Sequence, residues 1–429
     1  MHTNKIGIIG LGYVGLPLCL QFARKGISVL GLDVDQVKVD SINKGISYIK
    51  HIADSEIGDT LNQKAFSAST DFSRVKELNA VLICVPTPLD QHREPDLSYV
   101  LKSGQAIAPY LKAELGEPKK IVVLESTTYP GTTDTDLRQI LENDSGLKAG
   151  KDFHLAYSPE REDPGRTDHS VKTIPKVMGG YTPQCLERCR ELYLLALDQV
   201  HPVGSCRVAE ATKLTENIFR AVNIAMVNEL KVVFNKMGID VWDVIQAAAT
   251  KPFGYMPFYP GPGLGGHCIP IDPFYLTWKA REFEQHTRFI ELAGEINTAM
   301  PDYVVSVVAQ ALNEESKSIK GSRILLLGLA YKPNVDDDRE SPSYRLMEKL
   351  EHKGASVDYN DPHVPVIRPN REFPHYAGRA SKNISLNYDL ILLATHHQEY
   401  KEHDFSSCQI PIVDTRNWIA SRPAKYYQA

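Results

Sequence analysis

The amino-acid sequence predicts an α/β protein made of an α/β domain, an all-α domain and a second α/β domain. Short apolar runs alternate with helical patterns over about the first 200 residues, which is typical of strands joined by crossover helices. A long stretch without glycine or proline follows, and its apolar residues recur at helical spacing. From Ser322 the alternating pattern returns. We therefore expect domains at 1–206, 207–316 and 317–429.

The apolar runs of the first domain are bounded by glycine, proline or charged residues, as buried strands are. They are Lys5–Ile9, Ser28–Asp33, Ala80–Val85 and Ile121–Ser126, with weaker candidates at Leu155–Tyr157 and Lys176–Gly179 near the far edge of the sheet. The segments between them are long enough for the crossover helices that parallel pairing requires. This pattern predicts a doubly wound sheet.

The central domain is expected to begin with one helix over Arg207–Met237, which Gly238 ends. At about 1.5 Å per residue this helix would be about 45 Å long, so we expect it to link domains and to supply a dimer face. Further helices are expected at Val241–Ala249 and Phe283–Glu314, separated by a Pro/Gly-rich loop over Lys251–Pro273.

The third domain repeats the architecture of the first without a detectable sequence repeat. Its expected strands are Arg323–Gly328, Ala355–Tyr359, Leu390–Ala394 and Pro411–Asp414, with a helix over Tyr344–Lys353.

Composition and charge exclude several classes of protein. The 429 residues are 42% hydrophobic and 24% charged, as in ordinary globular proteins. With 48 basic and 53 acidic residues, the net charge of −5 argues against broad binding to nucleic acid. No apolar run reaches about 18 residues, so we expect no membrane-spanning helix. The expected compartment is the cytoplasm.

The seven cysteines are an odd number at low density, which favours a reducing compartment over a disulfide framework. Cys84 lies inside an apolar run and is expected to be buried. Cys185 and Cys189 are four residues apart, but no Cys-x-x-Cys or His-x-x-x-His pair accompanies them. We interpret them as thiols on a helix surface rather than half of a zinc site, and we expect no metal.

The segment Gly10-Leu11-Gly12-Tyr13-Val14-Gly15 matches the dinucleotide-binding pattern G-x-G-x-x-G between a strand and a helix. Gly10 permits the tight turn, Gly12 lets the backbone approach a pyrophosphate, and Gly15 lets the helix pack on the strand. Asp33 ends the second strand, where its carboxylate can accept from ribose hydroxyls and would repel a 2′-phosphate. We therefore predict a Rossmann-like domain that binds NAD. The alternative is a turn that needs glycines only for packing.

Two threonines follow other expected strands. Thr87 lies in Val85-Pro86-Thr87-Pro88, and Thr127 lies in Ser126-Thr127-Thr128. Ligands of open α/β sheets bind at the carboxyl ends of strands, so both threonines are candidates to contact the cofactor. A plain turn is the alternative for each.

Candidate chemical residues lie farther along the chain. Cys268 follows a glycine-dense loop, which indicates a nucleophile, with a buried loop thiol as the alternative. Lys213 and Asn217 share one face of the long helix, and the alternative is a solvated face. Ser158-Pro159-Glu160-Arg161 follows a strand end and offers an acid, or else forms a surface turn.

Taken together, these motifs resemble the UDP-sugar 6-dehydrogenase family. The resemblance covers nearly the whole chain and rests on Gly10–Gly15, Val85–Pro88, Ser158–Arg161, Lys213 with Asn217, Gly265–Asp272, Gly328–Lys332 and Arg339–Ser341. It implies an NAD domain, a helical dimerisation domain and a domain that binds the UDP moiety. It also implies a homodimer or larger homo-oligomer, and a role in making precursors of bacterial surface polysaccharides.

The resemblance further implies a four-electron oxidation of the sugar C6 hydroxyl to a carboxylate with two NAD. Cys268 would form a thiohemiacetal and then a thioester. Lys213 and Asn217 would stabilise the oxyanion, Asp272 would hold water and move protons, and Glu160 and Thr127 would assist hydrolysis. The implied cofactor contacts are Gly10, Gly12, Tyr13, Val14, Gly15, Asp33, Thr87, Thr127 and Arg339. The implied substrate contacts are Glu160, Arg161, Lys213, Asn217, Tyr259, Gly265, Lys332 and Arg416.

The sugar is suggested by the residues around the cysteine. UDP-glucose enzymes commonly show Gly-Gly-Ser-Cys and a Lys-Asp pair, whereas this chain has Gly265-Gly266-His267-Cys268 and Ile271-Asp272. The aromatic loop 251–260 resembles the branch that oxidises UDP-N-acetylhexosamines, most closely the bacterial UDP-N-acetylglucosamine 6-dehydrogenases. We expect UDP-N-acetylglucosamine first, its manno epimer second and UDP-glucose third.

Two different classes of protein remain as alternatives. A β-hydroxyacid dehydrogenase would oxidise only once, and it would need no thiol and lack the α/β domain that residues 322–429 form here. A non-catalytic regulator that binds nucleotide sugars would be expected to lose Cys268, Lys213 or Asp272, and all three are present. Because Gly328–Lys332 departs from G-x-G-x-x-G, the third domain is not expected to hold a second NAD through that turn.

Overall fold

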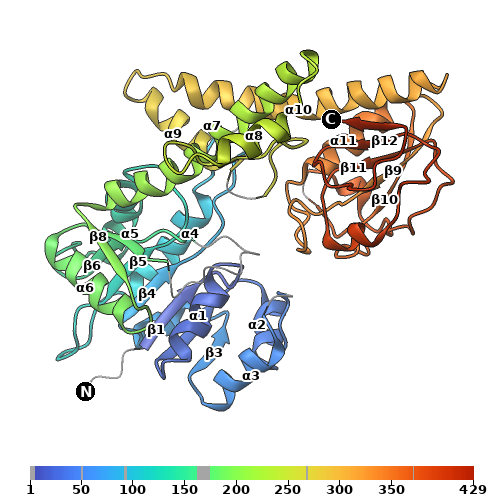
Figure 1. Cartoon of the computed structure of the whole chain (residues 1–429). Coiled ribbons are helices and arrows are strands. Elements are labelled where there is room, and N and C mark those ends of the chain that lie inside the picture. The colour runs from blue at the N-terminus through green and yellow to red at the C-terminus, as the bar shows by residue number, and fades with distance from the viewer. Residues whose placement is uncertain (1–4, 50–51, 91–93, 162–173, 267–268, 371) are drawn as a thin grey trace. The chain divides into compact units, whose positions relative to one another are not determined.

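A computed structural model describes residues 5–49, 52–90, 94–161, 174–266, 269–370 and 372–429 (Figure 1). The chain divides into two compact units. Unit 1 comprises Met1–Glu216 and Phe274–Gln285, and unit 2 comprises Asn217–Pro273 and His286–Ala429. No helix of the described residues is long and apolar enough to span a membrane.

Unit 1 contains a twisted sheet whose described strands number eight, in the order β3-β2-β1-β4-β5-β6-β7-β8. All neighbours pair in parallel except β6 and β7. The strands are β1 (Lys5–Ile9), β2 (Ser28–Leu32), β3 (Phe66–Ser69), β4 (Ala80–Ile83), β5 (Ile121–Leu124), β6 (His154–Tyr157), β7 (Lys176–Gly180) and β8 (Val200–Val203). The helices are α1 (Gly15–Ala23), α2 (Gln36–Asn43), α3 (Asp54–Asn62), α4 (Ser98–Ile107), α5 (Arg138–Ser145) and α6 (Pro183–Leu194), with two 3-10 helices, η1 (Phe72–Glu77) and η2 (Ala108–Tyr110), and a short π-helix, η3 (Thr132–Leu137).

The central strands are apolar throughout because both of their faces are covered. In β4, Ala80 and Leu82 join the core on the side of α1, α2 and α6, whereas Val81 and Ile83 join the core on the side of α4 and α5. The prediction of a doubly wound α/β domain is therefore confirmed. Strands β3 and β8 were not expected, because β3 reads Phe-Ser-Ala-Ser and β8 is partly exposed and contains Pro202.

The cysteines of α6 correct one expectation. Cys185 and Cys189 lie on the helix as expected, but both are completely buried rather than on its surface. Their spacing of four places them on the face that covers the sheet. Cys84 is buried, as its apolar run predicted.

The long helix α7 (Cys206–Lys236) has 31 residues and crosses from unit 1 to unit 2. Gly238, at a φ of +72°, follows its end. There the N–H of Ile239 donates to the carbonyl of Phe234, 2.9 Å away, which is the expected glycine stop. The other central helices are α8 (Val241–Ala249), α9 (Asp272–Arg281) and α10 (Arg288–Glu314). Helix α9 was not expected, and α10 begins later than Phe283.

The C-terminal part of unit 2 is a parallel sheet in the order β10-β9-β11-β12-β13. Its elements are β9 (Arg323–Leu327), α11 (Pro342–His352), β10 (Ser356–Asn360), η4 (Pro374–Tyr376), β11 (Leu390–Leu393), η5 (Gln398–Glu402), β12 (Ile412–Asp414) and β13 (Tyr426–Gln428). In β9, Ile324 and Leu326 join one core while Leu325 and Leu327 join another. The second α/β domain is thus confirmed, with the short edge strand β13 as an addition.

Candidate active site

The turn after β1 has the geometry that its glycines predicted. Gly10 has a φ of +89°, and a Cβ atom there would lie 2.8 Å from the carbonyl oxygen of Cys84. A Cβ atom on Gly15 would lie 1.9 Å from the carbonyl oxygen of Gly10, so α1 can pack here only without a side chain. Among the described residues, nothing lies within 4 Å of the Cβ position of Gly12. The backbone is therefore open beside the N-terminus of α1, where a pyrophosphate would bind.

Asp33 is held beside this turn. Its Oδ2 accepts from the N–H of Leu11 at 2.8 Å, and its Oδ1 accepts from the N–H of Asp35 at 3.0 Å. The ammonium of Lys38 lies 3.7 Å from Oδ2. A carboxylate at this position can accept hydrogen bonds from ribose hydroxyls, so these residues fit NAD. Tyr13 and Val14 pack partly buried against the core on the α1 side.

The loops after β4 and β5, which carry Thr87 and Thr127, are joined to each other. The hydroxyl of Ser126 donates to the carbonyl of Val85 at 2.6 Å. Both threonines are half-buried at the carboxyl ends of their strands. They therefore lie at the edge of the sheet where the sequence placed them. Cofactor contact by either threonine stays a prediction.

Glu210 of α7 accepts hydrogen bonds from the segment that follows Thr127. Its carboxylate accepts from the N–H groups of Gly131 and Thr133, at 2.7 and 2.9 Å, and from the Thr133 hydroxyl at 2.7 Å. Burial raises the pKa of Glu210 to about 7, although these hydrogen bonds act in the opposite direction. Sequence analysis missed this role because the partners lie 77 and 79 positions earlier in the chain.

Lys213 and Asn217 follow on successive turns of α7. Lys213 is 7% exposed and Asn217 is 1% exposed, so this part of the helix is not a solvated face. In unit 2, the Asn217 amide donates to Oδ2 of Asp272 at 2.5 Å. Arg220 donates to the Asn217 carbonyl oxygen at 2.6 Å, a contact that the sequence did not suggest. Two predicted catalytic residues, 55 positions apart, are thus in direct contact.

In unit 1, Glu160 and Arg161 are bonded to residues that the sequence did not single out. Lys176 of β7 donates to Oε2 of Glu160 at 3.2 Å. Arg161 donates to Pro175 at 2.7 Å and forms an ion pair with Glu216 at 2.5 Å. The segment is therefore an anchored strand end rather than a free surface turn.

The glycines before Cys268 bring the loop 261–266 close to the second α/β domain. A Cβ atom on Gly261 would lie 2.3 Å from the guanidinium of Arg416, and one on Gly265 would lie 2.8 Å from Tyr331. The N–H of Gly261 also donates to Asn228 of α7 at 3.0 Å. Cys268 itself and His267 lie outside the described residues.

The same Asn228 belongs to a buried chain of amides. Its Nδ2 donates to Asn297 of α10 at 2.9 Å, and Asn297 donates to the carbonyl of Ala221 at 3.1 Å. Both asparagines are almost completely buried. Since buried amides are costly unless they are bonded, this chain fixes the loop on two helices.

The remaining predicted substrate and cofactor contacts occupy defined positions in unit 2. Tyr259 stacks on Trp242 with ring centroids 5.7 Å apart. Arg416 donates through Nε to Ala394 at 2.9 Å, and burial lowers its pKa to about 10. Arg339 forms a two-pronged pair with Asp337 at 2.8 and 2.6 Å, so a phosphate would have to replace that partner. Lys332 is half-buried just after Tyr331.

The turn after β9 repeats the backbone of the turn after β1, which we call the NAD turn. It does not repeat the accessible carboxylate that the NAD turn has. Gly328 has a φ of +86°, and Leu329 donates to Asp361 after β10, as Leu11 donates to Asp33 after β2. Asp361, however, accepts from four backbone N–H groups and bonds His397, and it is 1% exposed. Although burial opposes ionisation, these bonds hold the pKa of Asp361 below its ordinary value. A ribose could not reach this carboxylate, which supports the expectation of no second NAD here.

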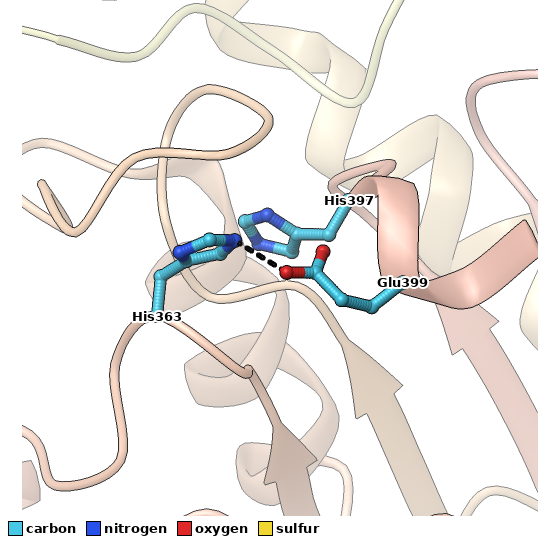
Figure 2. Close-up of side chains that lie close together, drawn as sticks. All are labelled: His363, His397 and Glu399. Atoms are coloured by element: carbon cyan, nitrogen blue, oxygen red, sulfur yellow. Dashed lines mark ion pairs between the residues drawn. The ribbon is translucent and has the colours of Figure 1, made fainter.

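Beside Asp361, the side chains of His363, His397 and Glu399 face one another (Figure 2). Their possible ligand atoms all lie within 4.8 Å, as a metal site would require. Both ring nitrogens of His397 are engaged, because Nδ1 accepts from Asn334 at 2.9 Å and Nε2 bonds Asp361 at 3.0 Å. His363 pairs with Glu399 at 3.1 Å. This arrangement favours a hydrogen-bonded network over a cation site.

The NAD turn, the helical segment with its Asn217–Asp272 pair and the second α/β domain together define a dehydrogenase of the nucleotide-sugar type. The UDP-glucose/GDP-mannose dehydrogenase family matches through its NAD binding domain at residues 4–196, its central domain at 207–299 and its UDP binding domain at 325–421. The chain belongs to this family, and it is an NAD-dependent UDP-sugar dehydrogenase.

Individual relatives extend over almost the whole chain. A UDP-N-acetyl-D-glucosamine 6-dehydrogenase of Pseudomonas aeruginosa is 38% identical, over 94% of this chain and 92% of that protein. A UDP-N-acetyl-D-mannosamine dehydrogenase of Campylobacter jejuni is 35% identical, over 93% and 97%. The solved structure of a UDP-D-ManNAc dehydrogenase from Pyrococcus horikoshii has a TM-score of 0.88 at 30% identity and covers 99% of this chain and 98% of that one.

Proposed function

We propose that this protein oxidises the C6 hydroxyl of UDP-N-acetyl-D-glucosamine to a carboxylate in two successive steps. The observation that carries the proposal is the buried Asn217–Asp272 contact, which joins two residues of the implied catalytic set. A relative named as a 6-dehydrogenase of the same sugar supports the substrate. UDP-N-acetylmannosamine is the second candidate, because other similar proteins are named for it. UDP-glucose is the third.

The reaction requires a nucleophile that can hold the aldehyde. When bound, NAD supplies the acceptor for each hydride that leaves C6. Cys268 adds through sulfur to the aldehyde carbon, and the resulting thiohemiacetal can lose its hydroxyl proton and a second hydride to become a thioester. Water then attacks the thioester carbon, the C–S bond breaks, and the uronate leaves the restored thiolate.

We assign the surrounding residues by their chemistry. The ammonium of Lys213 and the amide of Asn217 stabilise the oxyanion, since both lie in a buried part of α7 where a charge is weakly screened. Asp272 accepts from Asn217 and can order water beside it. Glu160 and Thr127 assist hydrolysis of the thioester.

Recognition of the substrate is assigned to loops on unit 2 and to the end of β6. Gly265, Lys332 and Arg416 lie on or against segments that pack on one another, so they can serve one ligand. The exposed, stacked ring of Tyr259 offers an apolar surface for an acetamido methyl group. Glu160 and Arg161 complete the proposed set, and Arg339 serves the cofactor after exchange of Asp337.

We further propose that this protein is a homodimer and that α7 packs against a second copy of the chain at the dimer interface. Phe219, Met226 and Val233 recur at a spacing of seven and are each about half exposed, at 47%, 45% and 46%. Apolar residues at this spacing form one stripe along a helix, as in helix–helix interfaces. We propose domain limits at 1–206, 207–316 and 317–429. These limits are compatible with the three matched regions.

The test is a panel of UDP-N-acetylglucosamine, UDP-N-acetylmannosamine and UDP-glucose, scored by NADH formation with the product mass determined. We expect the highest kcat/KM with UDP-N-acetylglucosamine and about two NADH per sugar, because an alcohol loses four electrons on becoming an acid. One NADH per sugar would support the single-oxidation class instead. Cys268→Ser should bind both ligands and make no uronate, and normal turnover would refute the covalent mechanism.

A further inference from the structure

A buried lysine stands between two glutamates in unit 1. Lys176, the first residue of β7, donates to Oε2 of Glu125 at 2.5 Å and to Oε2 of Glu160 at 3.2 Å. The side chain of Lys176 is 5% exposed, that of Glu125 is completely buried, and that of Glu160 is 19% exposed. Tyr193 of α6 donates its hydroxyl to the other oxygen of Glu125.

The topology of the sheet creates this cluster. Strands β6 and β7 are the antiparallel pair, so Glu160, which follows the end of β6, lies near Lys176 at the start of β7. Glu125 directly follows β5, two positions before Thr127. Lys176 thus connects the two segments that carry the residues assigned to thioester hydrolysis.

The cluster has more acidic than basic groups, because the single ammonium of Lys176 faces two carboxyl groups. Burial alone would lower the pKa of Lys176, but the two carboxylates raise it above its ordinary value, so the lysine stays charged. Burial raises the pKa of Glu125. The other ionisable groups beside Lys176 and Glu125 are Cys84 after β4 and Tyr193 and Cys189 on α6. The backbone N–H of Arg161 donates to Oε1 of Glu160 at 2.7 Å, and the Arg161 guanidinium pairs with Glu216. Lys176 thus places a cation directly on the Glu160 carboxylate.

We propose that Lys176 is a positioning residue that keeps Glu160 ionised and oriented as the base for thioester hydrolysis, with Glu125 holding the lysine in place. This proposal rests on the proposed function. In the step concerned, a water oxygen bonds to the thioester carbon and one water proton passes to Glu160. The C–S bond breaks with its electron pair on the Cys268 sulfur, and the acid product releases the second proton to solvent.

Removal of the lysine charge should slow hydrolysis and leave the hydride transfers largely unchanged. In Lys176→Met, two carboxylates would share a nearly dry site, so one of them would take up a proton at neutral pH. With UDP-N-acetylglucosamine and NAD, we expect kcat to fall by about 100-fold, the usual effect of losing a general base. The first turnover of NADH should stay within about twofold of the native rate. Intact-protein mass spectrometry of quenched samples should show a thioester adduct on Cys268 accumulating.

Two matched variants separate this role from a structural one. Lys176→Arg keeps a cation and should restore much of kcat. Glu125→Gln removes the competing carboxylate, so the acid limb of the kcat–pH profile should lie at or below the native one, whereas Lys176→Met should move it to higher pH. The proposal would be overturned if the acid limb moved to higher pH in both Glu125→Gln and Lys176→Met. It would also be overturned if Lys176→Met turned over normally without an adduct. If Lys176→Met does not fold, the direction of the Glu125→Gln shift decides.

The native enzyme separates the two proposals. If it makes no NADH and no adduct with any of the three UDP sugars, the proposed function itself is wrong. If it makes about two NADH per sugar and the lysine variants hydrolyse normally, only the role of Lys176 fails.

Discussion

Replacement of Glu210 by glutamine should make the stability of unit 1 less sensitive to pH. Glu210 is fully buried and accepts three hydrogen bonds from Gly131 and Thr133, yet its pKa is raised to about 7. Because the folded state holds this proton more tightly than the unfolded chain, the stabilisation is complete below the ordinary pKa of 4.5. It is then lost as the pH rises through about 7.

The magnitude follows from the difference between the two pKa values. Each pKa unit corresponds to about 1.4 kcal/mol, so a rise from 4.5 to about 7 makes folding less favourable by ~3 kcal/mol at pH 8 than at pH 4. Glutamine has nearly the shape of the protonated acid and cannot ionise. The glutamine NH2 group would face a donor such as the N–H of Gly131, a cost that is the same at every pH. Relative to the native protein, Glu210→Gln should therefore gain ~3 kcal/mol of stability between pH 4 and pH 8.

Thermal unfolding of both proteins at pH 4 and pH 8 measures this difference. For a unit of this size, ~3 kcal/mol means that the Tm of Glu210→Gln relative to the native protein should be about 6–12 °C higher at pH 8 than at pH 4. Glu187→Gln is the control, because Glu187 is an exposed residue of α6 and its loss should shift Tm little at either pH. The reasoning would be refuted if the difference in Tm between Glu210→Gln and the native protein were the same at both pH values.

Three further outcomes are expected. Asp33→Asn removes the charge that repels a 2′-phosphate, so the preference for NAD over NADP in kcat/KM should fall by about tenfold or more. Gly266→Ala places a Cβ atom 2.7 Å from the ring of Tyr331 at a φ of +83°, so NADH formation should fall at least about tenfold while NAD binding, measured by calorimetry, is retained. Asp361→Asn turns an amide N–H toward backbone donors, so a chemical-denaturation curve should show the C-terminal sheet destabilised by about 3 kcal/mol with NAD affinity unchanged.

Much of the fold was readable because it is encoded locally. The strands with both faces covered are continuous apolar runs, so β1, β4, β5 and β9 were found with bounds within about two residues. Edge strands β3, β8 and β13 were missed because an exposed edge needs neither apolar runs nor strict alternation. Helix α9 was missed because its sequence Asp-Pro-Phe-Tyr-Leu follows a loop rich in glycine and proline.

The candidate site divides in the same way. Gly10, Gly15 and Asp33 could be assigned from spacing, because a tight turn between a strand and a helix imposes its own local rules. Lys176, Glu125 and Glu210 could not, because their meaning depends on partners far away in the chain. A lysine at the start of a strand and a glutamate on a helix are ordinary in sequence until folding buries them together.

The residues alone determined the order of the three domains, the dinucleotide turn and the long helix. This was possible because hydrophobic periodicity and the placement of glycines are properties of neighbouring positions. The tertiary structure decided which charged groups meet. It paired Asn217 with Asp272, seated Lys176 between two carboxylates, and turned Asp361 into a fully bonded anchor where the equivalent Asp33 faces the NAD turn. The physical reason is that burial and hydrogen bonding depend on distances in space, and chain topology, rather than spacing along the sequence, sets those distances.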